Sequence, residues 1–160
     1  MDLLDRQLAH DEWATTQLLN RSRDLTDAQL DQEFDIGHRT LRETLDHLIF
    51  IVDFWTTLMA GQPVKWERNV HRSIGEMADR HARFYPAFAT LARRIHDEQR
   101  LDDTFTDHFG GPMTYGGAIS HVILHDAEHR VEAVHMLGRL GLDNVPEVDH
   151  GLWDYERRGL

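Results

Sequence analysis

Four long stretches of the chain repeat their apolar residues at helical spacing, and this pattern limits the possible folds more than any other feature. Apolar side chains recur every three or four residues, which places them on one face of a helix with 3.6 residues per turn. Polar segments with turn chemistry separate the stretches. The sequence therefore predicts an all-α four-helix bundle forming one domain, residues 1–160. The expected helices run from about Leu3 to Leu25, from Thr40 to the turn at Gly61, from Ser73 or Ile74 to Gln99, and from Gly116 to Gly138 or Gly141.

Shorter elements are expected between and after these helices. Thr26 and Asp27 read as a helix cap followed by one short turn. Residues 64–72 are expected to form a loop, and residues 101–117 a short hairpin or ordered loop packed over one end of the bundle. The tail to Leu160 has mixed polarity, and Leu152, Trp153 and Tyr155 are able to dock on the core.

The composition restricts the chemistry that the chain can perform. There is no cysteine among the 160 residues, so disulfides, thiolate metal sites and a cysteine nucleophile are excluded. The net charge of −11 repels phosphate backbones, which argues against nucleic-acid binding. No stretch approaches the about 20 apolar residues of a membrane span, and the acidic N-terminus is unlike a signal peptide. We therefore expect a cytoplasmic protein without a membrane partner.

Three histidines lie on one line of the last long helix. His121, His125 and His129 are spaced by four residues, so that they form a nearly straight ridge. Two imidazoles one helical turn apart can bind one divalent ion, as in zinc sites with the His-x-x-x-His spacing. The alternative is that these are ordinary core or surface residues of a chain with 12 histidines.

A third ligand is expected from the second long helix, which is the most apolar of the four. His47 lies there on the same line as Ile51, Phe54 and Leu58. A lone histidine on such a line is usually a core residue, but burying an imidazole opposite a two-histidine site is costly unless something pairs with it. His81 and His96, on the third helix, are too far apart to share an ion and are expected at the surface.

Acidic residues near these histidines are candidates for proton transfer. Glu132 returns to the ridge one turn after His129 and could be a fourth ligand, an acceptor for a ligand imidazole, or a general base. Glu43 lies one turn before His47 and could also complete a capping box with Thr40. Asp126 and Arg130 point away from the ridge and are expected to serve packing or ion pairing.

Two other metal sites compete with a three-histidine site. Residues 125–129 match the H-x-x-E-H pattern of inverzincin proteases, with Glu128 as base, but little chain remains for their downstream ligand. A di-iron bundle requires two Glu-x-x-His motifs on paired helices. Residues 132–135 supply one motif, whereas residues 147–150 follow a proline in the tail.

Taken in order, these residues resemble the DinB/YfiT-like superfamily of small metal-binding bundles over nearly the whole chain. The resemblance rests on Trp13 in the first helix, on residues 41–48 with Trp55 behind them, and on residues 121–130 running into residues 137–141. It implies a four-helix bundle, commonly a homodimer, with three histidine ligands that fall on His47, His125 and His129. His121 matches a position that is often histidine but not usually a ligand.

The chain departs from the family pattern after the last ligand. The family often has His-Arg-Gly-Gln there, whereas this chain has Val131 and Glu132 after Arg130. Characterised relatives of this kind include thiol-dependent S-transferases and a maleylpyruvate isomerase. The resemblance therefore implies a small-molecule substrate, and a low-molecular-weight thiol is one candidate.

The sequence leaves three hypotheses. In the first, a divalent transition metal (Zn, Ni or Fe) on His47, His125 and His129 activates a low-molecular-weight thiol or water against a small electrophile, with Glu132 or Glu43 handling the proton. In the second, the chain is a non-catalytic metal-binding stress-response protein with a closed site of three histidines and Glu132. In the third, the histidines are core residues of a helical dimer.

Overall fold

Four long helices dominate the computed structural model, which describes residues 1–67 and 70–160. They are α1 (Leu3–Ser22), α3 (Leu41–Met59), α4 (Ile74–Asp97) and α5 (Tyr115–Arg139). The predicted four-helix bundle is confirmed, and each helix boundary lies within a few residues of its predicted position. Within the described part of the chain, no helix is both long enough and apolar enough to cross a membrane.

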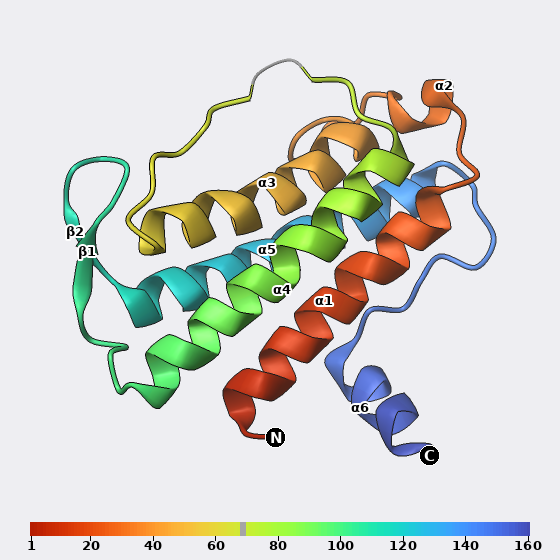
Figure 1. Cartoon of the computed structure of the whole chain (residues 1–160). Helices are drawn as coiled ribbons and strands as arrows, with labels where there is room; N and C mark the ends of the chain where they lie inside the picture. Colours follow the sequence, from red (N-terminus) through yellow and green to blue (C-terminus); the bar gives the residue numbers. More distant parts are fainter. Residues whose placement is uncertain (68–69) are drawn as a thin grey trace.

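The helices are arranged so that α3 contacts both α4 and α5, and α1 contacts the same two helices. Figure 1 shows that α1 and α5 run in one direction and α3 and α4 in the other. Because α3 and α4 run in the same direction, the connection between them returns along the length of the bundle over α3. This connection contains the predicted loop 64–72, of which residues 68–69 lie outside the described part.

Local capping residues set where the helices begin. Ser73 and Glu76 form a reciprocal capping box at the start of α4, with a 2.8 Å bond from the Ser73 amide to the Glu76 carboxylate. At the start of α3, the Thr40 hydroxyl accepts the Glu43 amide at 3.1 Å. The Glu43 carboxylate in turn accepts a hydrogen bond from the Thr40 hydroxyl at 3.3 Å. In a capping box it would accept from the Thr40 backbone amide, so Thr40 caps the helix as predicted but the second bond of the box has a different donor.

Two of the short elements lie at the ends of the bundle, and the third packs beside α1. The capped turn after Thr26 forms α2 (Asp27–Leu30), and the predicted hairpin is present as β1 (Thr104–Thr106) paired antiparallel with β2 (Pro112–Thr114). The tail contains a helix that the sequence analysis did not predict, α6 (His150–Arg158). Trp153 on α6 is buried, whereas Tyr155 is 56% exposed, so only one of the two aromatic rings docks.

The core consists of two apolar clusters, one toward each end of the bundle, with a buried polar layer between them. In this layer Asp11 of α1 forms a buried ion pair with Arg130 of α5 and accepts the Tyr85 hydroxyl of α4 at 2.7 Å. Arg130 is therefore an ion-pairing residue, as expected. Asp126 is also fully buried in this layer.

His81 also belongs to the buried layer, which corrects its expected position at the surface. Its side chain is 5% exposed, and its Nε2 lies 3.3 Å from the carbonyl oxygen of Glu12 on α1. The reason is its spacing: it lies four residues after Met77 and four before Tyr85, both of which are completely buried. His96, near the end of α4, is partly exposed.

Candidate metal centre

The three histidines expected to act as ligands meet between α3 and α5. The Nε2 of His125 lies 3.1 Å from the Nε2 of His47 and 3.2 Å from the Nε2 of His129. The helical spacing of four places His125 and His129 on the side of α5 that faces α3, and His47 reaches them from α3. The structure therefore brings the three predicted side chains together, with three ring nitrogens directed at one region.

These nitrogen separations fit a shared metal ion. Zinc–imidazole bonds of about 2.0–2.1 Å place two ligand nitrogens about 2.9 Å apart at a right angle and about 3.3 Å apart in a tetrahedron. The two measured separations, 3.1 and 3.2 Å, lie within this range. A single proton on His125 Nε2 could serve only one of its two nitrogen neighbours, whereas a cation would satisfy all three lone pairs.

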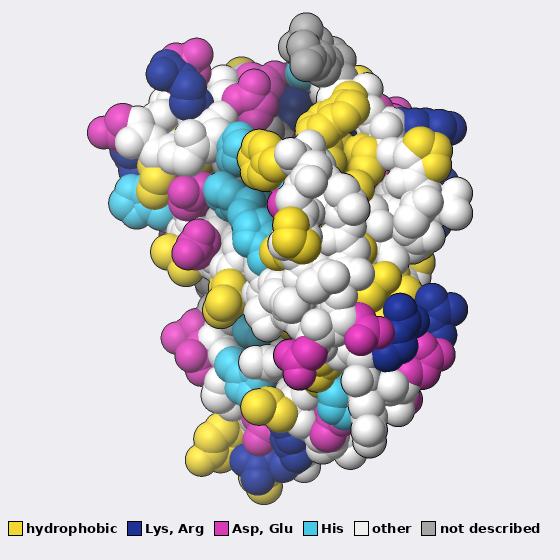
Figure 2. Space-filling model, turned by 90° about the vertical axis from the view of Figure 1, so that its left-hand side faces the viewer, with side chains coloured by type: hydrophobic (Ala, Val, Ile, Leu, Met, Phe, Trp, Pro, Cys, Tyr) yellow, Lys and Arg dark blue, Asp and Glu magenta, His cyan; other side chains and the backbone are white. Residues whose placement is uncertain are grey.

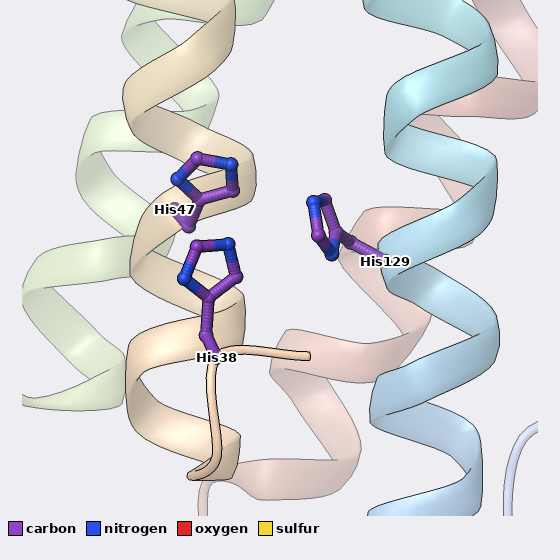
Figure 3. Close-up of side chains that lie close together, drawn as sticks. All are labelled: His38, His47 and His129. Atoms are coloured by element: carbon purple, nitrogen blue, oxygen red, sulfur yellow. The ribbon is translucent and has the colours of Figure 1, made fainter. Parts of the chain in front are cut away.

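A fourth imidazole, which the sequence analysis did not single out, joins this cluster. His38 lies in the loop before α3, and its ring centroid is 3.9 Å from that of His47 and 4.9 Å from that of His129. One nitrogen from each of these three rings lies within 4.8 Å of the others. Figure 3 shows His38 and His47 side by side, facing His129 across the gap between the helices.

A tight turn carries His38 into the site. The amide of Phe34 donates to the carbonyl of Arg39 at 2.7 Å, and Gly37 and Arg39 both have positive φ, +48° and +70°. A Cβ on Gly37 would overlap the Glu132 carboxylate, and the positive φ disfavours a side chain, so glycine at this position lets Glu132 keep its place against the loop. The turn thus seats the loop against the same glutamate that follows the histidine ridge.

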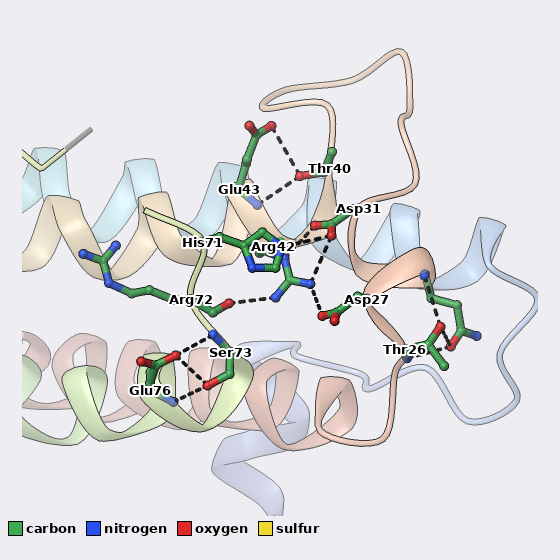
Figure 4. A network of polar contacts seen from close by, with 11 residues as sticks. Thr26, Asp27, Asp31, Thr40, Arg42, Glu43, His71, Arg72, Ser73 and Glu76 are labelled. Carbon is green, nitrogen blue, oxygen red and sulfur yellow. Dashed lines mark hydrogen bonds and ion pairs between the residues drawn. The ribbon is translucent and has the colours of Figure 1, made fainter. Parts of the chain in front are cut away.

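A polar network anchors this loop at its other end (Figure 4). Arg42 of α3 donates to Asp31 at 2.6 Å, to Asp27 at 2.5 Å, and to the carbonyl of Arg72 at 2.7 Å. Asp27, Asp31 and the nearby His71 form a second group with metal-ligand chemistry, but all three are exposed. Because the guanidinium of Arg42 already neutralises both carboxylates, we assign this group a structural role.

Glu132 contacts a histidine of the cluster from its outer side. The Nδ1–H of His129 donates to the Glu132 carboxylate at 2.6 Å. This bond fixes the tautomer in which the His129 Nε2, the nitrogen that faces His125, has a free lone pair. The geometry corresponds to the acceptor role among the three that the sequence left open for Glu132.

His125 has a similar arrangement with the buried layer of the core. Its Nδ1 lies 3.6 Å from a carboxylate oxygen of Asp126. Among the described residues, neither of these two buried atoms has a hydrogen-bond partner. At 3.6 Å the two atoms lie just beyond hydrogen-bond distance, so Asp126 is the nearby carboxyl group toward which an Nδ1–H of His125 would be directed, as that of His129 is toward Glu132.

Burial favours the neutral form of three of these imidazoles. It lowers the pKa of His47 from 6.5 to about 3 and that of His125 to about 4, and the neighbouring histidines add to both shifts. The pKa of His38 is also lowered, again chiefly by burial. A neutral imidazole has the lone pair that a metal ion requires, so the rings are ready to act as ligands near pH 7.

The remaining residues considered from the sequence lie at the edges of the site. Glu43 is exposed at the start of α3 and, with His38 and His47, lines a polar cavity of about 350 Å³. The ring of His121 packs against Trp55 at 5.2 Å and against His125 at 5.3 Å. Both residues are therefore near the cluster but outside the group of converging nitrogens.

The alternative metal sites have less support. Glu128, the base of an inverzincin site, is exposed on α5, as is His135 of the first di-iron motif. His150 of the second motif begins α6 and packs on His10, with ring centroids 4.9 Å apart. These residues do not join the histidine cluster, so the cluster around His125 is the better candidate centre.

Comparison with known proteins places the chain in a family. The family model of the DinB superfamily matches residues 10–133, which include every histidine of the cluster. The chain belongs to the DinB superfamily. A search of curated proteins gives no match. The crystal structure of a DinB-like protein from Bacillus cereus ATCC 10987 is similar in fold, with a TM-score of 0.71, 24% identity, and coverage of 91% of this chain and 95% of that one.

DinB proteins are typically metal-binding, and this member has a histidine cluster suited to that property. Figure 2 shows histidine side chains gathered in a strip along a hollow on one face of the molecule, with apolar side chains beside it. Two cavities of this DinB protein are lined by residues of the cluster, one by His38 and His47 and the other by His47 and His125. Solutes can therefore reach the histidines.

Proposed function

We propose that the protein is a metal-dependent enzyme in which His47, His125 and His129 hold one divalent transition metal. The observation that carries this proposal is the position of three Nε2 atoms. That of His125 lies 3.1 Å from the Nε2 of His47 and 3.2 Å from the Nε2 of His129. The reaction would be the attack of a low-molecular-weight thiol or water on a small electrophile. Membership of the DinB superfamily supports metal binding.

The metal, when bound, would lower the pKa of the thiol or water and would polarise the electrophile. The chain's own residues set up the site for this chemistry. Glu132 accepts the Nδ1–H of His129 and so directs its Nε2 inward, and Asp126 is placed to do the same for His125. Glu43, exposed at the mouth of the polar cavity with His38, is available to exchange a proton with solvent.

His38 favours a second candidate function, a metal-binding protein without turnover. A fourth imidazole beside His47 and His129 could complete a closed tetrahedral site, which is typical of structural rather than catalytic metals. The sequence analysis expected Glu132 to close such a site, whereas here Glu132 is engaged with His129 Nδ1. The two candidates thus differ in whether His38 is bound to the metal when substrate arrives.

Cobalt substitution distinguishes the two candidates, because the visible spectrum of Co²⁺ reports its coordination. The protein is loaded with one equivalent of Co²⁺ and titrated with 2-mercaptoethanol, in the parent and in His38→Ala. The enzyme proposal predicts a thiolate-to-cobalt charge-transfer band in both proteins. A band that appears only in His38→Ala would show a closed site and would favour the non-catalytic function. Failure of both proteins to bind Co²⁺ would reject the metal centre itself.

A further inference from the structure

A large cavity beside the histidine cluster has walls of a different chemical character. Its volume is about 570 Å³, within the usual range for small-molecule sites. His47 and His125 form part of its wall, so the cavity adjoins the region where the ring nitrogens converge. Most of its other walls are aromatic or aliphatic: Phe50, Phe54, Trp55, Trp66, Phe109 and Met113.

The aromatic walls come from three separate parts of the chain. Helix α3 provides Phe54 and Trp55, whose rings meet edge to face with centroids 5.4 Å apart. The connection after α3 places Trp66 with its ring centroid 5.1 Å from that of Phe54. The turn between β1 and β2 adds Phe109 to the lining of the cavity. Rings that meet at these distances and angles present both faces and edges to a planar guest.

Two of these aromatic rings are largely exposed to solvent. Trp66 is 61% exposed and Phe109 is 85% exposed. Burying such rings against an apolar group removes about 25 cal/mol of unfavourable free energy for each Å² taken out of water. A ligand that contacts both rings would therefore be stabilised by exposed surface that the protein alone leaves in water.

The charges around the cavity select against anionic ligands. Among the described residues that line it, Asp107 is the only carboxylate, no Lys or Arg is present, and the basic side chains are the imidazoles of His47, His108, His121 and His125. One carboxylate oxygen of Asp107 accepts the amides of Phe109 and Gly111, each at 2.9 Å, and so shapes the turn. Away from the metal centre, a carboxylate or phosphate on the ligand would find no Lys or Arg to pair with in this cavity, and the net charge of −11 would repel it.

The polar cavity on the other side of His47 differs in composition. It is lined by Glu43, Asp46 and Glu67, and its one arginine, Arg72, is paired with both Asp46 and Glu67. It therefore offers more charged groups than the aromatic cavity, although Phe50 and Trp66 line both cavities. The two cavities together can separate a ligand's polar part from its apolar part across the histidine cluster.

We infer that the aromatic cavity binds an uncharged aromatic group, so that the small electrophile on which the enzyme acts carries such a group. The identification of this group as part of a substrate rests on the function proposed above. The binding of an aromatic group does not rest on that function, because the aromatic side chains that would contact the group are distinct from the three proposed metal ligands. The reactive end of the substrate would lie toward His47 and His125.

Two fluorescent probes with the same ring skeleton test this inference. N-phenyl-1-naphthylamine is neutral, and 8-anilinonaphthalene-1-sulfonate adds one sulfonate. Each is titrated into the full chain, once with one equivalent of Zn²⁺ and once with EDTA. In EDTA, we expect one neutral probe per chain, bound at least about tenfold more tightly than the sulfonate, because without the metal the anion is desolvated with no Lys or Arg as a partner.

Variants at exposed positions show where the probe binds while leaving the fold intact. Trp66→Ala should weaken the neutral probe about three- to tenfold, the loss typical of one aromatic contact, and Phe109→Ala should act in the same direction. Leu124→Ala is the matched control, since Leu124 is 64% exposed on α5 and does not line the cavity. Its affinity for the probe should equal that of the parent.

Two results would overturn the inference: equal or tighter binding of the sulfonate in EDTA, or unchanged neutral-probe affinity in both Trp66→Ala and Phe109→Ala. Comparing the titrations with Zn²⁺ and with EDTA shows whether the aromatic-cavity inference or the metal-site proposal has failed. Metal binding without selective probe binding rejects only the aromatic cavity. Selective probe binding in a protein that takes up no metal rejects only the proposed enzyme.

Discussion

Replacing Glu132 tests whether it acts through His129. In the structure, its carboxylate accepts the His129 Nδ1–H at 2.6 Å, with both side chains largely shielded from solvent. A hydrogen bond to a charged group of this kind contributes about 1.5–3 kcal/mol. Since 1.4 kcal/mol is a factor of ten, Glu132→Ala should weaken metal binding about 10- to 100-fold. Glu132→Gln retains an acceptor of the same shape and should lose about tenfold or less.

The assay is a competition titration of Zn²⁺ between the protein and a chelating dye. Glu128→Ala is the control, because Glu128 is exposed on the same helix and has no contact with the cluster. The reasoning is refuted if Glu132→Ala binds Zn²⁺ as tightly as the parent. It is also refuted if Glu132→Gln loses the metal as completely as His129→Ala, since that result would make Glu132 a ligand.

Two further predictions concern the surroundings of the cluster. Gly37→Ala should lower both thermal stability and Zn²⁺ affinity, because its Cβ would overlap the Glu132 carboxylate and its φ of +48° disfavours a side chain; unchanged values in a melt and a titration would contradict this. Asp126→Asn should remove a contribution to stability that falls as pH rises. Burial raises the pKa of Asp126 above 3.8, so the folded state holds the proton that the unfolded state releases, and the unfolding free energy falls as pH rises through that window. Because the lowered histidine pKa values make the stability of both proteins rise with pH, the prediction concerns their difference. In urea unfolding from pH 4 to 8, the unfolding free energy of Asp126→Asn minus that of the parent should increase with pH, and a difference that does not change with pH would count against the prediction.

The bundle and three members of the histidine cluster could be predicted because helical geometry fixes them. A spacing of four residues puts His125 and His129 on one side of a helix wherever that helix packs. His47 could be placed opposite them because it lies on the apolar line of its helix, and the apolar faces of the helices in a bundle pack against one another. The homodimer and the cytoplasmic location, which rest on resemblance and composition, stay predictions.

His38 was missed because loops have no periodicity from which a direction can be read. Its position depends on the turn at Gly37 and on the packing of that turn against Glu132, a contact between residues 95 positions apart. The glycine directly before a histidine, close to the start of α3, was the available signal. The burial of His81 could have been predicted, since Met77, His81 and Tyr85 continue one apolar line. Helix α6 has a capping residue, Asp149, but too few apolar residues to reveal it.

Metal content measured on untagged protein tests the central claim most directly. The parent and His47→Ala are purified in parallel, incubated with Zn²⁺ or Ni²⁺, desalted and assayed by elemental analysis, with circular dichroism to confirm that both are folded. The account predicts about one ion per chain in the parent and almost none in His47→Ala. A parent that binds no stoichiometric metal, or a folded His47→Ala that still binds one ion per chain, would contradict it.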